Sequence, residues 1–395
     1  MLCAMNSRPL PPGQWVPVPP MPGIPEHLLR EGAYLPSPLP SDLWLPMSTY
    51  RSCADAEHAL GRLDEAADRL GVRSALVRAT QVRDANSSAG MAGIAMGLRE
   101  AFVVDLLLSR GAPPLEGTGH EAVAPYRRAY EHGVDRLRAG VPNDVGLVGQ
   151  MAAIMAGRPP DRPGDVLRDA PGRLGAKPED AYLLTATGAH LVALLEQWST
   201  WLRDEDRQPR SAQIAIAHYQ LEVLQPFPTA NGHVARLFSL LELVRTGLLR
   251  DQVLPLSVWL DDAMPDYRRQ LRAVVDTGMI NQWVDFFTAG LRAQALAQLR
   301  LIARLEELAA DYARRLPVKG RLPQVAAELI GFPVVDHPWL CERHGVTARA
   351  ATDLTARLVD LDILVPWESR GYRRVFLCPD VLNLLADDPD TTAHF

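Results

Sequence analysis

The sequence predicts an all-α fold with a helical N-terminal region, a helical core and a small C-terminal winged helix. Apolar residues recur at helical spacing through most of the chain, for example over 54–70 and 211–224. Near the C-terminus, a helix-turn-helix pattern is followed by two strand-like segments, which is the order of a winged helix. We therefore expect helices joined by short loops to account for most of the 395 residues.

The N-terminal arm, residues 1–46, is rich in proline and is expected to be mostly non-helical. Proline fixes φ and removes a hydrogen-bond donor, so this arm should be extended and should wrap a surface or stay mobile. Further along the chain, a loop rich in Pro, Gly and Arg is expected over 158–176. Helices are predicted at 54–70, 74–84, 95–108, 121–139, 144–156, 180–202, 211–224, 232–245, 256–260, 266–276 and 282–305, the last extending toward 315.

A separate C-terminal unit is predicted to begin near Pro317. Its expected helices are 322–330, 338–344 and 348–361, with Thr347 as the N-cap of the third. Strands are expected at 363–366 and 373–377. We therefore divide the chain into the arm 1–46, a helical N-terminal region 47–118, a core 119–316 and a winged helix 317–395.

Composition is that of an ordinary globular protein, with 47% hydrophobic and 22% charged residues. No apolar run reaches the roughly 18 residues that span a bilayer, and residues 1–25 lack a signal-peptide pattern, so we expect a cytoplasmic protein without a membrane partner. The four cysteines are scattered without metal-ligand spacing, so no metal site is predicted. The net charge of −6 argues against a general nucleic-acid binder.

The C-terminal unit is acidic rather than basic. Residues 318–395 carry eight Lys or Arg and eleven Asp or Glu, a net charge of about −3. Arg349 and Arg357 lie on the helix that would enter a DNA groove, and Arg370, Arg373 and Arg374 on the hairpin. Because counterion release from phosphates requires a basic surface, DNA is not the expected partner. We expect homodimerisation or domain docking instead.

The loop between the predicted helices 211–224 and 232–245 has the features of an anion site. A loop that opens a helix directs backbone N–H groups at one point, and the helix dipole adds to this. Arg236 lies one turn into the helix and could pair with a phosphate or carboxylate. The alternative is that Asn231 caps the helix and Arg236 makes a structural salt bridge. The sequence here reads Gln225-Pro226-Phe227-Pro228-Thr229-Ala230-Asn231-Gly232-His233-Val234-Ala235-Arg236.

This loop resembles the signature of the Fic family, H-P-F-x-[D/E]-G-N-G-R-x-x-R. The resemblance implies a Fic-like helical core and a loop that holds nucleotide phosphates. The residues that match are Pro226, Phe227, Asn231, Gly232 and Arg236. Four positions depart from the signature: Gln225 replaces the His, Thr229 the acid, Ala230 the first Gly and His233 the first Arg.

The resemblance extends along the chain. Residues 83–93 are similar to the family's inhibitory helix: Ser88 and Gly93 fit its S-x-x-x-E-G motif, and Ala92 stands where the inhibitory Glu belongs. Residues 34–40 are similar to the Pro-rich opening of the family's N-terminal region. Residues 216–222 resemble the helix before the signature, and 256–260 with 266–267 a downstream element whose usual Asn-Arg pair is Ala263-Met264.

The departures from the signature concern its chemistry. The family mostly transfers AMP from ATP to protein hydroxyls, with the His as base and the acid as Mg²⁺ ligand. The Gln225 amide has no useful pKa, although it can orient a carbonyl or hydroxyl, and Thr229 is a poor Mg²⁺ ligand. Ordinary AMP transfer and Mg²⁺ binding are therefore not expected. A nucleotide remains the one cofactor that the resemblance suggests.

Other side chains could have new roles in the site. His233 could act as acid or base, or bind phosphate when protonated, or simply be a tolerated substitution. By resemblance, Trp259 and Tyr267 would lie near the nucleotide and could cover a base, although ordinary packing is the alternative. His218 is expected to be a packed core histidine and Glu222 a structural residue.

Three readings of function follow. The favoured one is a repurposed enzyme that acts on an anionic small molecule or protein substrate, bearing phosphate or carboxylate, in the old nucleotide loop. The candidate catalytic residues are then Gln225 and His233. The candidate ligand- or anion-binding residues are Thr229, Ala230, Asn231, Gly232, Arg236, Trp259 and Tyr267. A catalytically inactive regulatory or binding module and a residual AMP transferase are the alternatives, and the sequence leaves open whether the chain is an enzyme.

Overall fold

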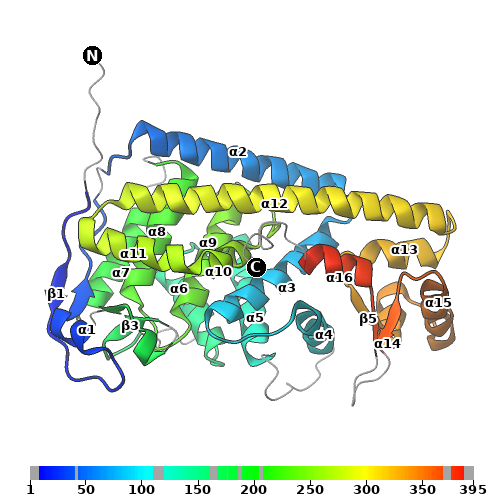
Figure 1. The fold of residues 1–395 in the computed structure, drawn as a ribbon, viewed down its shortest axis with the longest axis horizontal. Coiled ribbons are helices and arrows are strands. Elements are labelled where there is room, and N and C mark those ends of the chain that lie inside the picture. The colour runs from blue at the N-terminus through cyan, green and yellow to red at the C-terminus, as the bar shows by residue number, and fades with distance from the viewer. Residues whose placement is uncertain are drawn as a thin grey trace.

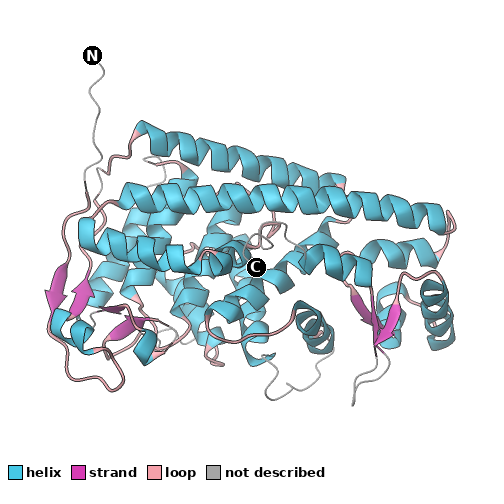
Figure 2. Ribbon diagram, viewed as in Figure 1, coloured by secondary structure: helices cyan, strands magenta, loops and turns pink. Residues whose placement is uncertain are grey.

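The computed structural model of the chain describes residues 9–40, 43–109, 120–160, 167–175, 177–185, 189–203, 208–367 and 375–386. The protein is mostly helical, with 66% of its residues in helices and two small sheets (Figures 1 and 2). This confirms the predicted all-α class. None of the helices in the described residues is long and apolar enough to cross a membrane.

The N-terminal arm contributes to a four-stranded sheet. It forms β1 (Gln14–Val16), α1 (Glu26–Glu31) and β2 (Ala33–Leu35). β2 pairs in parallel with β4 (Leu183–Thr185), which pairs antiparallel with β3 (Gly172–Leu174), and the sheet order is β1-β2-β4-β3. The arm is therefore extended against the core, with Tyr34 buried.

The sheet corrects one predicted element. The segment 180–202 was predicted as a single helix, but it contains the short helix η2 (Pro178–Asp180), then β4, and only then α7 (Ala189–Leu202). Leu183 and Leu184 are fully buried in β4. Hydrogen bonds to β2 on one edge and β3 on the other hold this short apolar run extended.

The helical N-terminal region surrounds one buried helix. Its elements are α2 (Met47–Arg69), α3 (Arg73–Met91) and α4 (Leu98–Leu108), and the core begins with α5 (His120–Arg138) and α6 (Val145–Met155). α3 is longer than predicted and packs against α2, α4, α5, α9 and α10. The buried carboxylate of Asp84 fixes it, because this group accepts hydrogen bonds from the Ser257 amide at 2.6 Å and the Tyr126 hydroxyl at 2.8 Å.

The core is built on a pair of consecutive helices, α8 (Arg210–Leu224) and α9 (Asn231–Arg245). Every α8 residue after Arg210 is buried, as expected of a helix at the centre of a helical protein. α10 (Leu256–Asp262) and α11 (Met264–Thr277) follow. The 36-residue α12 (Ile280–Arg315) lies beside α2 along one edge of the molecule (Figure 1).

The C-terminal unit follows the predicted order of elements with two additions. It contains α13 (Arg321–Glu328), β5 (Val334–Asp336), α14 (His337–His344), α15 (Ala348–Asp360), β6 (Val365–Trp367), β7 (Val375–Leu377) and α16 (Pro379–Ala386). β5 and α16 were not anticipated. Thr347 caps α15 through a hydrogen bond from Ala350 N. The hairpin tip, with Arg370, Arg373 and Arg374, lies outside the described residues.

The C-terminal unit is packed closely on α3. Gly331 lies against the backbone of Ala75 near the start of α3, so an added Cβ would overlap that backbone. The Arg78 guanidinium of α3 stacks over the ring of Phe332 at 5.8 Å from its centroid. One continuous cluster of buried apolar side chains includes residues of both the core and this unit. The two parts therefore share a hydrophobic core.

We predict that Gly331→Ala lowers the free energy of unfolding by about 1–3 kcal/mol, because the new methyl group forces the backbones of Gly331 and Ala75 apart. Gly61→Ala, within α2, is the matched control: no atom lies within 4 Å of its added Cβ. This control should be stabilised by about 0.5–1 kcal/mol, as expected for glycine replaced inside a helix. Urea unfolding measures both, and equal midpoints for the two variants would contradict the prediction.

Candidate functional site

The loop between α8 and α9 contains two residues with left-handed backbone conformations. Gln225 ends α8 at φ 43°, and Ala230 precedes α9 at φ 63°. Such conformations cost an alanine roughly 1–2 kcal/mol. Asn231 compensates by bracing the loop: its Oδ1 accepts from Phe227 N at 2.8 Å and its Nδ2 donates to Phe227 O at 2.7 Å. Its side chain thus bridges the loop instead of capping α9.

A buried arginine from outside the signature fixes the other end of the loop. Arg168 donates to the carbonyl oxygens of Leu224 and Gln225, which α8 leaves unpaired, and to Thr185 Oγ1 of β4. Its own amide donates to Pro226 O at 3.0 Å. Burial lowers the pKa of Arg168 to about 10. Arg168 therefore ties the loop to the sheet through contacts that involve no ligand.

Arg236 is a buried cation held by neutral groups. Its side chain is 4% exposed. Nε donates to Ser88 Oγ at 2.9 Å, and Nη2 donates to Ser88 O and to His233 Nδ1, each at 3.3 Å. No carboxylate among the described residues forms an ion pair with it. Nη1 points at Gly232, where an added Cβ would lie 3.0 Å away.

The hydrogen bonds of Ser88 define the state of His233. Because Ser88 Oγ accepts from Arg236 Nε, its own hydrogen is free for His233 Nδ1, 2.8 Å away. Nδ1 is then an acceptor, and the ring proton lies on Nε2. Burial, with Arg236 adding to it, lowers the pKa of His233 from 6.5 to about 3. His233 is therefore a neutral ring at physiological pH and does not bind phosphate as a cation.

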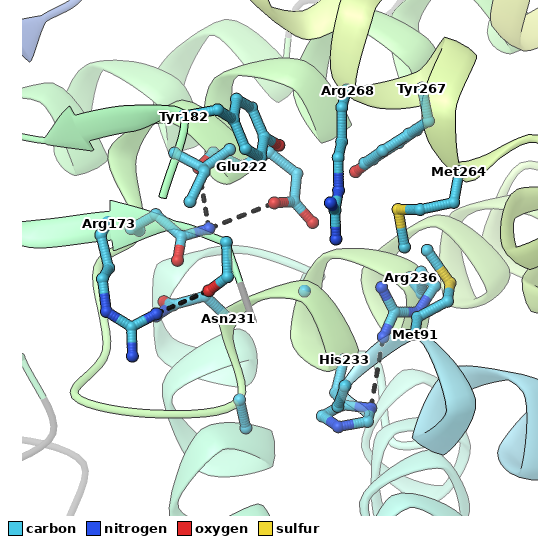
Figure 3. A pocket seen from close by; sticks show the side chains of 16 residues that line it. Met91, Arg173, Tyr182, Glu222, Asn231, His233, Arg236, Met264, Tyr267 and Arg268 are labelled. Carbon is cyan, nitrogen blue, oxygen red and sulfur yellow. Dashed lines mark hydrogen bonds between the residues drawn. The ribbon is translucent and has the colours of Figure 1, made fainter. Parts of the chain in front are cut away.

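A pocket of about 240 Å³ opens above this cluster (Figure 3). Three guanidinium groups line it, from Arg173, Arg236 and Arg268, and Glu222 supplies the one carboxyl of the described lining. This surplus of positive charge suits an anionic ligand. The other lining residues are Met91, Ala92, Leu174, Gly175, Tyr182, Gln225, Ala230, Asn231, Gly232, His233, Met264 and Tyr267.

Gln225, which replaces the signature His, is bonded to Glu222. Its Nε2 donates to the main-chain oxygen of Glu222 at 2.9 Å and to Glu222 Oε2 at 3.1 Å. A carbonyl oxygen only accepts, so the amide nitrogen must face Glu222, and Gln225 keeps its Oε1 as an acceptor. Burial raises the pKa of Glu222, while Arg236 and a hydrogen bond from Tyr267 act in the opposite direction.

Most of the residues singled out in the sequence come together here. Gln225, Ala230, Asn231, Gly232, His233, Arg236, Tyr267 and Ala92 line the pocket, and Ser88 lies directly behind Arg236. Three others do not reach it. Thr229 and Gly93 are exposed. Trp259 packs on Phe286 with ring centroids 4.9 Å apart and covers Gly290, where a Cβ would overlap its indole.

His218 lies beneath the pocket in a fully bonded position. Its Nδ1 faces Ser239 Oγ at 2.8 Å and Ala235 O at 3.1 Å, and its Nε2 faces the Tyr267 hydroxyl at 2.9 Å. Burial and then Arg236 lower its pKa to about 3. The ring is buried completely, so it positions Tyr267 and does not contact the pocket.

Sequence reasoning missed Arg173 and Arg268. Arg268 follows Tyr267 directly, so its place on α11 was a usable signal. Arg173 belongs to the segment 158–176, which was predicted to be a loop from its Pro, Gly and Arg content alone. No local sequence pattern indicates that Arg173 lies in β3 and lines the pocket. Tyr182, Met91 and Met264 are further lining residues that local patterns did not reveal.

The lining does not fit the Mg²⁺ ion that AMP transfer uses. Mg²⁺ requires oxygen ligands, usually carboxylates. Here the described lining offers Glu222 alone, among three guanidinium groups, and position 229 is an exposed threonine. Elsewhere in the described residues, no group of three or more His, Cys, Asp or Glu side chains could hold a metal ion.

Comparison with known proteins agrees with this architecture. Residues 148–243, which include α8, the loop and α9, match the model of the Fic/DOC family. The chain therefore carries a Fic domain. A Fic family protein from Desulfovibrio desulfuricans G20 is 15% identical, with a TM-score of 0.56 over 86% of this chain and 98% of that one. At this identity the likeness concerns the fold.

Two further solved structures have lower scores. A Fic domain containing signaling protein from Bacteroides thetaiotaomicron VPI-5482 is 15% identical, with a TM-score of 0.46 over 63% of this chain and 98% of that one. Fic-1 from C. elegans is 16% identical, with a TM-score of 0.46 over 65% of this chain and 74% of that one.

We predict that His233 makes the folded protein sensitive to acid. Its folded-state pKa of about 3 lies below its ordinary 6.5, so between these values the unfolded state binds more protons. The free energy of unfolding should be fully maintained above pH 6.5 and fall below it by up to about 1.4 kcal/mol per pH unit for this group. His233→Gln removes this contribution, so its stability should fall less steeply than that of the wild type between pH 6.5 and 4.5.

Chemical unfolding at several pH values measures the free energy of unfolding of the wild type and of His233→Gln. The contributions of His218 and the buried acids are the same in both proteins and cancel in the difference. His27→Gln, on the exposed face of α1, is the control and should follow the wild type. If the free energy of unfolding depends on pH in the same way for the wild type and His233→Gln, His233 is not a neutral, buried group.

Proposed function

We propose that this protein is a divergent Fic-fold enzyme that binds a phosphate- or carboxylate-bearing substrate in the pocket above α9 and no longer performs ordinary AMP transfer. The observation that carries this proposal is the buried Arg236. Its Nε and Nη2 are held by neutral groups, and its Nη1 points at Gly232 on the pocket floor. A buried guanidinium is costly without an anionic partner, and a bound anion would supply one.

The surrounding lining supports the same ligand class. Arg173 and Arg268 add two further cations around the pocket, and α9 begins at its floor with the positive end of its dipole. Ala92 lies in the lining where the family has its inhibitory Glu, so a carboxylate at that position does not compete for Arg236. A small anion or the anionic end of a larger substrate fits this arrangement.

The chemistry of AMP transfer has less support. Gln225 cannot accept a proton from an attacking hydroxyl, since an amide is not basic at working pH. His233 lies close by, but its lowered pKa and its bond to Ser88 leave it a weak base. A carboxylate for Mg²⁺ is missing at position 229. These three features argue against the family's usual reaction.

We predict that the purified protein, incubated with labelled ATP and Mg²⁺, labels neither itself nor proteins of a cell lysate. The reason is the loss of both the base and the metal-binding acid. In-gel detection of transferred AMP is the measurement, with an active AMP transferase as positive control. Robust labelling that Arg236→Ala abolishes would show that the site still performs the family reaction.

We also predict that Arg236→Ala weakens anion binding about tenfold or more, because a hydrogen bond to a charged group contributes roughly 1.5–3 kcal/mol. Ala92→Glu should weaken it too, by placing a competing carboxylate beside Arg236. Calorimetry and thermal shift against ATP, ADP, AMP, phosphate esters and carboxylates measure the effect.

The chain offers a matched pair of controls on α11. Arg268→Gln removes a cation of the pocket and should weaken binding. Arg269→Gln removes its exposed neighbour, which pairs with Asp266 at the surface, and should leave binding unchanged. If no anion stabilises the wild type, and Arg236→Ala only lowers the melting temperature, Arg236 is structural and the proposal fails.

A further inference from the structure

The bare backbone of Gly232 leaves a niche between two buried side chains from different helices. A Cβ at Gly232 would lie 3.0 Å from Arg236 Nη1 and 3.4 Å from Glu222 Oε1. These side chains of α9 and α8 are 4% and 5% exposed, and both line the pocket (Figure 3). A ligand group above Gly232 therefore meets a guanidinium and a carboxyl at the same time.

The two groups remain apart because each is held by other residues. Ser88 of α3 fixes Arg236 through Nε and Nη2, and Gln225 donates to Oε2 of Glu222. Among the described residues, neither Arg236 nor Glu222 forms an ion pair. Nη1 and Oε1 are thus the two atoms that face the niche, one a permanent donor and the other an acceptor unless protonated.

Glu222 is the group of the lining whose protonation can respond to a ligand. Its charged neighbours are Arg236 on α9, Arg268 on α11 and Arg173 on β3, and the hydroxyls of Tyr267 and Tyr182 face it from α11 and the start of β4. Burial raises the pKa of Glu222 and of both tyrosines, whereas His233 stays neutral with a pKa of about 3. An anion drawn in by Arg236 would add negative charge next to the carboxyl.

We propose that Glu222 and Arg236 form a proton-coupled oxyanion niche that selects anions carrying a proton, namely phosphate and phosphate monoesters, over fully deprotonated sulfate. This rests on the proposed function, in which the pocket holds an anion. Arg236 Nη1 donates to one ligand oxygen. Oε1 of Glu222 can approach the same anion only if a proton lies between the two. Phosphate supplies that proton itself, whereas sulfate binds only when Glu222 has taken one up.

The experiment is calorimetric titration of the full-length protein with inorganic phosphate and with sulfate, from pH 6 to pH 8. Sulfate binding should weaken with rising pH, by up to about tenfold per unit once Glu222 ionises, because one proton is taken up on binding. Phosphate should bind throughout and more tightly than sulfate at pH 8. Repeating the titrations in two buffers of different ionisation enthalpy counts the protons taken up.

Glu222→Gln separates this role from mere structure. Its amide donates at every pH, so sulfate binding should become independent of pH and the preference for phosphate should disappear. Glu242→Gln is the matched control, because Glu242 is a buried carboxylate of α9 that pairs with Arg245 away from the pocket. It should keep the pH dependence of the wild type.

The outcomes are distinguishable. If the wild type binds both anions without pH dependence or proton uptake, or if Glu222→Gln keeps the dependence, the niche is not proton-coupled, although anion binding stands. If neither anion binds to the wild type, the proposed function fails and this inference fails with it. Should Glu222→Gln not fold, as judged by circular dichroism, the proton count of the wild type decides.

Discussion

A buried guanidinium without a carboxylate partner among the described residues sets the electrostatics of the core. The charge of Arg236 lowers the pKa of His218 and His233 beyond the effect of burial, and it opposes burial at Glu222, Asp84 and Asp261. Such a charge is tolerable only where hydrogen bonds replace water. Ser88 and His233 provide them, and α3 must therefore lie against α9 for the site to exist.

The scaffold of the site and its chemistry are carried by different residues. Asn231 and Arg168 hold the loop through its own backbone, and Asp84 holds α3 through Ser257 and Tyr126. At the positions that depart from the Fic signature these contacts use only the backbone, as when Arg168 donates to the carbonyl oxygen of Gln225. The loop can thus keep its left-handed Ala230 and its shape while Gln225 and Thr229 replace the base and the acid. A Fic domain can in this way keep the shape of its loop while the side chains at positions 225 and 229 differ from the signature.

The sequence predicted the fold better than the site. Long amphipathic helices and the proline-containing loop of 225–230 are local signals, and α8 and α9 begin within one residue of their predicted starts. The helix predicted over Leu183–Thr185 was wrong, because the spacing of apolar residues in so short a segment does not distinguish a strand from a helix. Ser88 and His233, which form a hydrogen bond, are 145 residues apart in the sequence. Trp259 lies against Gly290, 31 positions further along the chain, and so does not line the pocket. Tertiary packing decides such placements.

The close approach of Gly331 to Ala75 places the C-terminal unit against the same helix that carries Ser88. Ser88 lies about 13 residues beyond Ala75 on the same helix, or roughly 20 Å at the rise of an α-helix. A helix of this length is stiff along its axis, and α3 is enclosed by neighbouring helices over most of that distance. The packing of the C-terminal unit and the hydrogen bonds of Arg236 therefore depend on opposite ends of one helix.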